Sequence, residues 1–196
     1  MQYYIYSLVC FLLPGTVWLI WNKGMIADKA YKVRHIIWIY IYMFYGYLAV
    51  QEAAGIGTIW DLITYGKLDN SINLIPFSSE GAMTYILNII MFMPLGFLLP
   101  LIWKNFRNAK KVVLMGFVMS LAIEICQLFN LRATDIDDLM MNTLGALVGY
   151  CCWKVFSLIF RNAGTKCMEI KKSEPVIYMF GGILGLFLLY NWRVFD

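Results

Sequence analysis

The sequence has few charged residues and a single histidine, His35. Charged residues make up 14% of the 196 positions, against about a quarter in ordinary soluble domains. Hydrophobic residues make up 61%, and the mean hydropathy is +0.68. These values exclude a soluble domain and indicate a membrane protein. The scarcity of histidine argues against zinc or histidine-based catalysis, and the five cysteines show none of the paired spacings of metal or redox sites.

The first residues also lack Lys and Arg. A cleaved signal peptide begins with a basic segment, so the first apolar run is expected to be a true span. Six apolar runs approach the 20 or so residues that cross a bilayer. They predict an all-α fold, a polytopic membrane helical bundle of about six transmembrane helices, in a single membrane domain over 1–196. The predicted spans are residues 3–21, 35–54, 84–103, 112–130, 139–160 and 176–192.

Lys and Arg are concentrated in alternate connections between these runs. Three connections carry four cations each, and with Lys154 they hold 13 of the 16. Because cytoplasmic loops are rich in Lys and Arg, these connections are predicted to be cytoplasmic, and both termini extracytoplasmic. Nine of the 12 acidic residues then fall in the outer half. The net charge of +4 therefore belongs to a molecule with one basic end and one acidic end. Because the positive charge is not spread over one binding face, no nucleic-acid partner is expected.

Two further segments have recognisable patterns. The long outer connection, 55–83, contains the apolar stretch 59–65, which is too short to span and is flanked by glycines. It predicts a short interfacial or re-entrant helix. In the sixth span, Gly181, Gly182 and Gly185 have the spacing of small residues that allows close helix packing.

Glu124 is the most informative residue, because an ionisable group inside an apolar span is costly and marks a function or a buried partner by default. At 1.5 Å per residue it lies roughly 9 Å below the outer end of the predicted span. Ser120 and Gln127 share its helix face. Asn88 of the third span and Asn142 of the fifth lie in the same depth band. Three helices are therefore predicted to present polar groups to one layer.

The turn after the fourth span supplies Asp135, Asp137 and Asp138. One interpretation is helix capping, with Thr134 as the N-cap and Asp137 three residues on, since acids favour the positive end of a helix dipole. Another is a metal site, in which the three aspartates hold Mg²⁺ or Ca²⁺ and the ion bridges to a phosphate. Capping explains Asp138 less well than the other two, and it does not explain Glu124.

Three residues or segments near this turn bear on its interpretation. Arg132 lies about two turns beyond Glu124 and offers a structural ion pair that would neutralise the buried charge. The segment 73–77 contains an extended X-Pro step, and it is either a cover over the acidic cluster or an ordinary interfacial loop. His35 is predicted at the cytoplasmic end of the second span, away from this layer.

Four sequence blocks resemble the VanZ-like membrane proteins: NLIPF at 73–77, NIIMFMPLGFLLP at 88–100, EICQLF at 124–129 and RATDIDDLMMNTLG at 132–145. This resemblance places a core at about 70–150, with peripheral helices at about 3–21, 35–54 and 176–192. It implies a multi-pass protein of the bacterial plasma membrane, associated with reduced susceptibility to glycopeptide antibiotics, especially teicoplanin, in Gram-positive bacteria. It implies no agreed chemical mechanism.

The resemblance also implies a set of functional residues, carried over by motif position. These substrate-binding candidates are Asn88, Glu124, Gln127, Arg132, Asp135, Asp137, Asp138 and Asn142. Catalysis is left undecided, with Glu124 and Asp138 as its candidates. The expected partners are membrane lipids and a lipid-linked cell-wall precursor or a lipoglycopeptide.

Several functions are compatible with this sequence. The leading hypothesis is an envelope protein whose outer site binds or modifies a cell-wall or lipid-linked component. A second is a metal-dependent enzyme acting on a lipid phosphate, with the three aspartates holding Mg²⁺ or Ca²⁺ and Glu124 as general base. A transporter is disfavoured, because the sequence has no internal repeat and Glu124 is shallow. A structural role would use the glycine face of the sixth span to pack on another envelope protein.

Overall fold

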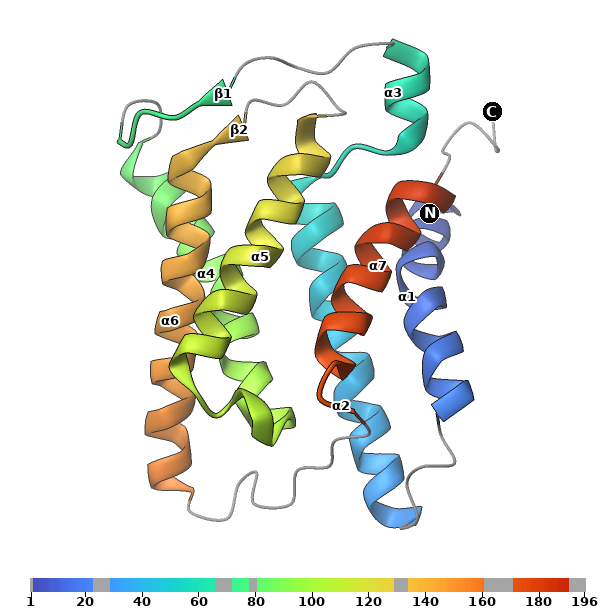
Figure 1. Cartoon of the computed structure of the whole chain (residues 1–196), viewed down its shortest axis with the longest axis vertical. Coiled ribbons are helices and arrows are strands. Elements are labelled where there is room, and N and C mark those ends of the chain that lie inside the picture. Colours follow the sequence, from blue (N-terminus) through green and yellow to red (C-terminus); the bar gives the residue numbers. More distant parts are fainter. Residues whose placement is uncertain are drawn as a thin grey trace.

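The computed structural model describes residues 2–22, 29–65, 72–77, 81–128, 134–160 and 171–190. Within these ranges the chain is an all-α bundle, as the sequence predicts, with a π-helical segment (η2), one 3-10 turn (η3) and two very short strands (Figure 1). The elements are α1 (Gln2–Asn22), α2 (Lys29–Tyr47), η2 (Leu48–Ala54), α3 (Ile59–Tyr65), β1 (Ile72–Asn73), α4 (Ala82–Ile102), η3 (Lys104–Phe106), α5 (Ala109–Gln127), β2 (Thr134–Asp135), α6 (Ile136–Ile159) and α7 (Glu174–Leu189).

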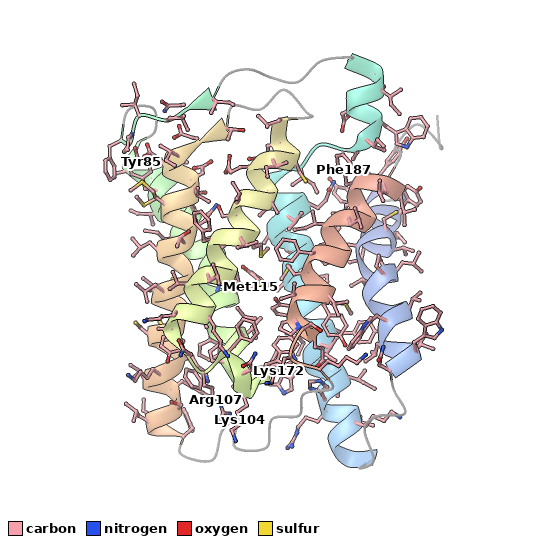
Figure 2. All side chains as sticks on the ribbon, in the orientation of Figure 1. Tyr85, Lys104, Arg107, Met115, Lys172 and Phe187 are labelled. Carbon is pink, nitrogen blue, oxygen red and sulfur yellow. The ribbon has the colours of Figure 1, made fainter. Side chains whose placement is uncertain are left out.

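Helices α1, α2, α4, α5, α6 and α7 run side by side and alternate in direction. As a result, α1 begins and α7 ends at the end of the bundle that carries α3, β1 and β2 (Figure 1). We call this end the acidic end, because the aspartates at the start of α6 lie there. Figure 2 shows Lys104, Arg107 and Lys172 at the opposite end, far from Tyr85. We call that end the basic end. Among the described residues, the charge separation predicted from the sequence is therefore present.

Four helical segments in the described part of the chain are long and apolar enough to cross a membrane: Tyr3–Asn22, Lys32–Gln51, Ala82–Ile102 and Ile136–Ile159. Large apolar side chains such as Ile37, Ile90 and Leu158 are exposed on the outside of the bundle, where lipid would cover them. Helix α5 carries two lysines and Glu124, and α7 has 16 residues. That these two also span the membrane, giving six spans, stays a prediction.

Helices α4 and α6 have the most extensive contact of any two described helices. A Cβ added to Gly96 would meet the backbone carbonyl of Ala146, and one added to Gly149 would meet that of Met93. Side chains are therefore absent where the two backbones approach most closely, as is common between helices in membranes. This contact fixes Asn88 of α4 beside the start of α6.

Replacing Gly149 with alanine is expected to destabilise the protein by about 1–3 kcal/mol, because the new methyl group would press on the Met93 backbone, which has no rotamer to change. The matched control is Gly181→Ala, whose Cβ would lie 3.5 Å from Pro14, an ordinary contact. Thermal unfolding of both purified variants in detergent measures the difference. Equal midpoints for the two variants would contradict the prediction.

The glycine face of α7 packs inside this chain. A Cβ on Gly182 would lie 2.5 Å from the Phe11 ring, and one on Gly185 would meet the carbonyl of Cys10. Close packing at this face is therefore confirmed, but the neighbour is α1. The hypothesis that another protein packs on these glycines is therefore wrong, because α1 of the same chain covers them.

The basic end contains a buried polar cluster around Glu174, the first residue of α7. The Glu174 carboxylate contacts the His35 Nε2 of α2 at 2.9 Å, and it accepts hydrogen bonds from Trp103 Nε1 and the Tyr178 hydroxyl, each at 3.0 Å. We call these four residues the Glu174 cluster. His35 does lie away from the acidic layer, as predicted, but its partner 139 residues away was not foreseen.

Candidate functional site

The acidic end is closed by a two-stranded parallel pairing between segments far apart in the sequence. Ile72 pairs with Thr134, and Asn73 pairs with Asp135. The pairing brings the loop that follows β1 onto the start of α6. The interpretation of 73–77 as a cover over the acidic cluster is therefore the one that the structure supports.

Asp135 is the N-cap of α6. Its Oδ1 accepts a hydrogen bond from the Asp137 amide at 2.9 Å, and its Oδ2 accepts one from Asn73 Nδ2 at 3.1 Å. The prediction of Thr134 as the cap is wrong by one residue, because Thr134 is paired in β2 and the helix begins at Ile136. Capping itself is confirmed, and it satisfies an amide that has no partner within the helix.

Asp137 anchors the covering loop. Its two carboxylate oxygens accept hydrogen bonds from the Phe77 amide at 2.8 and 3.0 Å, and Oδ2 also accepts one from the Tyr85 hydroxyl at 2.9 Å. The side chain is fully buried. Phe77 has φ of 60°, the left-handed region that L residues with large side chains rarely adopt. The hydrogen bonds to Asp137 hold the Phe77 backbone in this conformation, so the carboxylate has a structural role.

Asp138 points toward a deeper group of polar residues. Its Oδ1 accepts a hydrogen bond from Asn88 Nδ2 of α4. It also lies close enough to Glu124 of α5 for the two carboxylates to interact electrostatically. Three helices therefore converge at Asp138, as the depth argument predicts.

Glu124 is 3% exposed. Its carboxylate accepts a hydrogen bond from the Asp135 backbone, while Oε2 has no hydrogen-bond partner. Burying an unpaired carboxylate oxygen is costly unless something compensates it. The described residues supply no hydrogen-bond partner to this oxygen.

Asn142 forms the floor of the group one helical turn below Asp138. Its Nδ2 donates to the Ser120 hydroxyl of α5 at 2.9 Å, and its Oδ1 has no partner although the residue is 2% exposed. Because residues four apart share a helix face, Ser120 and Glu124 of α5 oppose Asn142 and Asp138 of α6. We call five residues the carboxylate layer: Asn88, Ser120, Glu124, Asp138 and Asn142.

Gln127 belongs to a different contact. Its Nε2 donates to the Ala54 carbonyl at 2.8 Å, at the end of η2, and the Gly57 amide donates to the Cys126 carbonyl at 3.1 Å. The π-helix continues α2 and ends at Ala54, and the next residue, Gly55, caps it with a left-handed φ of 65°. Sequence reasoning expected a plain helix to residue 54 and missed this junction. The sequence feature that could have indicated this irregular helix end is the polar pair Gln51 and Glu52, which interrupts an apolar run shortly before Gly55.

The eight residues predicted for the site fall into separate places. Four lie in the carboxylate layer: Asn88, Glu124, Asp138 and Asn142. Two lie between this layer and the acidic end of the bundle: Asp135 caps α6, and Asp137 anchors the covering loop. Gln127 faces η2. Arg132 lies outside the described residues, so its ion pair with Glu124 stays a prediction.

The three aspartates do not fit a shared metal site as they are arranged. Both oxygens of Asp135 and both of Asp137 already accept hydrogen bonds, three of them from main-chain amides. Among the described residues, no group of three His, Cys, Asp or Glu side chains is placed to hold a metal ion. Binding of Mg²⁺ or Ca²⁺ through these oxygens would compete with the hydrogen bonds that they accept, and it stays a prediction.

Comparison with known proteins agrees with the motif blocks. The VanZ/LLP1 family model matches residues 5–158, which includes α1 and α2 as well as the stretch that carries the motifs. The chain is 38% identical over 134 residues to Protein VanZ of Enterococcus faecium, an alignment that covers 67% of this chain and 77% of that protein. No solved structure matches this chain.

Proposed function

Because the chain belongs to the VanZ/LLP1 family, we propose that it lowers the susceptibility of a Gram-positive cell to glycopeptide antibiotics, teicoplanin in particular. The carboxylate layer, on the extracytoplasmic side, is the proposed site. There it binds or modifies a cell-wall or lipid-linked component and so alters the access of the lipid-tailed antibiotic.

The observation that carries this proposal is the unpartnered Oε2 of Glu124, buried between helices. A buried carboxylate that served only to hold the fold would be expected to have both oxygens satisfied, as Asp137 does. An ionisable group within a membrane span that lacks such satisfaction is a functional candidate.

The sidedness of charge supports an extracytoplasmic position for the layer. In the described residues every Lys and Arg lies on elements of the basic end, such as the starts of α2 and α5 and the turn before α7. Cytoplasmic loops are enriched in these residues. The acidic end would then face outward, with the start of α1 and the end of α7 on the same side (Figure 1).

Neutralising the layer is expected to abolish protection. In a sensitive Gram-positive host, wild type should raise the minimum inhibitory concentration of teicoplanin more than that of vancomycin, and Glu124→Gln and Asp138→Asn should each return it to the level of the empty vector. Both substitutions keep the side-chain shape and remove the charge. Membrane levels of all variants are matched by immunoblot.

The control is Asp61→Asn, another outer acid, whose Oδ2 accepts local bonds from Thr58 in front of α3. It should protect as wild type does. If Glu124→Gln and Asp138→Asn protect equally well, the layer is structural and the proposed site is wrong. If protection is lost on chelation of divalent cations while the variants bind metal less, the metal-dependent enzyme becomes the better explanation.

A further inference from the structure

We infer that the segment 72–77, which comprises β1 and the covering loop, inserts its apolar side chains into the membrane leaflet at the acidic end. There they contact lipid acyl chains, at the boundary between the acyl chains and the headgroups. The inference goes beyond the proposed function and is independent of it, because it concerns the outer surface of the loop and not the carboxylate layer. It holds whichever side of the membrane the acidic end faces.

The first observation is the exposure of large apolar side chains along this segment. Four of them are more than half exposed: Ile72, Leu74, Ile75 and Phe77. Of the other two residues, Asn73 turns its amide inward to Asp135, and Pro76 is exposed. Single exposed apolar residues are normal on a protein surface, but a contiguous group of this kind marks a surface that binds a partner or a membrane.

The backbone of the loop is also suited to a place with little water. The Ile75 amide donates to Asn73 Oδ1 at 3.1 Å. The Phe77 amide donates to the carboxylate of Asp137, and Pro76 between them has no N–H. Water can satisfy the amides of an ordinary surface loop, whereas an unpaired amide among lipids is costly. These three residues therefore present apolar side chains and no unpaired amide to their surroundings.

The third observation is that the loop continues a surface that faces lipid. Phe77 joins the loop to both helices of the pair α4 and α6, because its amide bonds to Asp137 of α6 and its ring lies 6.0 Å from the ring of Tyr85 of α4 (Figure 1). Both helices are long and apolar enough to cross a membrane. Farther from the acidic end, the same helices expose large apolar side chains: Ile86, Leu87, Ile90, Met140 and Leu144.

This continuity identifies lipid as the cover of the loop. Met140 and Leu144 lie three and seven residues after Asp137, so they share the helix face on which the loop is anchored. Acyl chains that cover this face of α6 meet the loop next as they approach the headgroups. An apolar surface that began and ended within the loop would have pointed instead to a protein partner.

The charge pattern of the sequence agrees with this position. Residues 70–79 carry no charge, and they lie between Asp69 and Glu80. A charged side chain is costly among acyl chains, whereas branched apolar and aromatic side chains are favoured there or at the interface. The uncharged stretch thus includes the whole of the segment that is inferred to insert.

Site-specific photocross-linking tests the inference. A benzophenone amino acid replaces Leu74 or Ile75 in the full-length protein, which is then reconstituted in nanodiscs of a single phospholipid. Both side chains are exposed, so the larger group needs no repacking. The lipid control carries the label at Leu158, which is 71% exposed on α6, and the water control carries it at Lys104, exposed at the far basic end (Figure 2). Intact-protein mass spectrometry after irradiation measures the fraction that has gained the mass of one lipid.

Labels at Leu74 and Ile75 are expected to give lipid adducts about as often as Leu158 and about tenfold more often than Lys104, because an inserted group stays in contact with acyl C–H bonds. Thermal unfolding of each labelled protein shows whether it is folded. If one label lowers the midpoint, the label at the other of the two loop positions decides.

Lipid adducts at the loop that are no more frequent than at Lys104 would overturn the inference. So would a cross-link between two copies of the chain, seen as a dimer on a denaturing gel. A cross-link from the loop to another part of the same chain, in place of lipid, would overturn it as well. Either of these products would show that protein, and not lipid, covers the segment.

Discussion

Replacing Glu174 with alanine is expected to reduce the free energy of unfolding by about 3–5 kcal/mol, the cost of removing one partner from a buried charged group. Glu174 is fully buried and accepts bonds from three side chains on three different elements. The substitution would leave the Trp103 N–H and the Tyr178 hydroxyl without an acceptor, each at a further desolvation cost.

This effect is large because the cluster ties α7 to the rest of the bundle. His35 brings in α2, and Trp103, which follows α4 as its C-cap, brings in that helix. The Trp103 ring also packs edge-on against Tyr42, with ring centroids 4.9 Å apart. One carboxylate thus fixes the basic end of three helices.

Unfolding of the purified variants in mixed detergent, titrated with dodecyl sulfate, measures the change. Tyr178→Phe removes one donor and leaves the contacts of the carboxylate with His35 and Trp103 in place, so its expected cost is about 1 kcal/mol. Lys172→Ala, at an exposed position beside α7, should change little. A Glu174→Ala variant as stable as Tyr178→Phe would show that the cluster does not hold the helices together.

Replacing Asp137 with alanine is expected to release the covering loop. The Phe77 amide would lose its acceptor, and the left-handed backbone at Phe77 would lose the bonds that hold it. A hydrogen bond to a charged group contributes about 1.5–3 kcal/mol. Because 1.4 kcal/mol is a factor of ten, amide exchange at Phe77 should become roughly 10- to 100-fold faster.

Hydrogen exchange followed by mass spectrometry of the 72–77 segment gives the measurement. Tyr85→Phe is the matched control, because it removes the third bond to Asp137 and leaves both bonds to the Phe77 amide. It should change exchange much less. Unaltered protection in Asp137→Ala would mean that the strand pairing of Ile72 and Asn73 is sufficient to hold the loop.

In the carboxylate layer, helix periodicity predicts the depth of the polar residues but not all of their partners. The rise per residue places Glu124, Asn88 and Asn142 at one depth, and the structure brings Asn88 to Asp138 and Asn142 to Ser120. The same periodicity put Gln127 on the face of Glu124, yet its amide turns to the Ala54 carbonyl. The helix period fixes the direction in which a residue leaves its helix. It does not fix which of two neighbouring helices a long side chain such as Gln127 contacts.

The sequence by itself determined the helices and the opposed charge of the two ends, because the length of an apolar run and the placement of Lys and Arg are local properties. Most predicted span ends lie within three residues of the helix ends. Tertiary structure alone decided the partners: His35 with Glu174, Asp137 with the Phe77 amide, and the glycines of α7 with α1. These residues are 60 or more positions apart. Their pairing depends on which helices pack together, and the local sequence around one residue does not determine that packing.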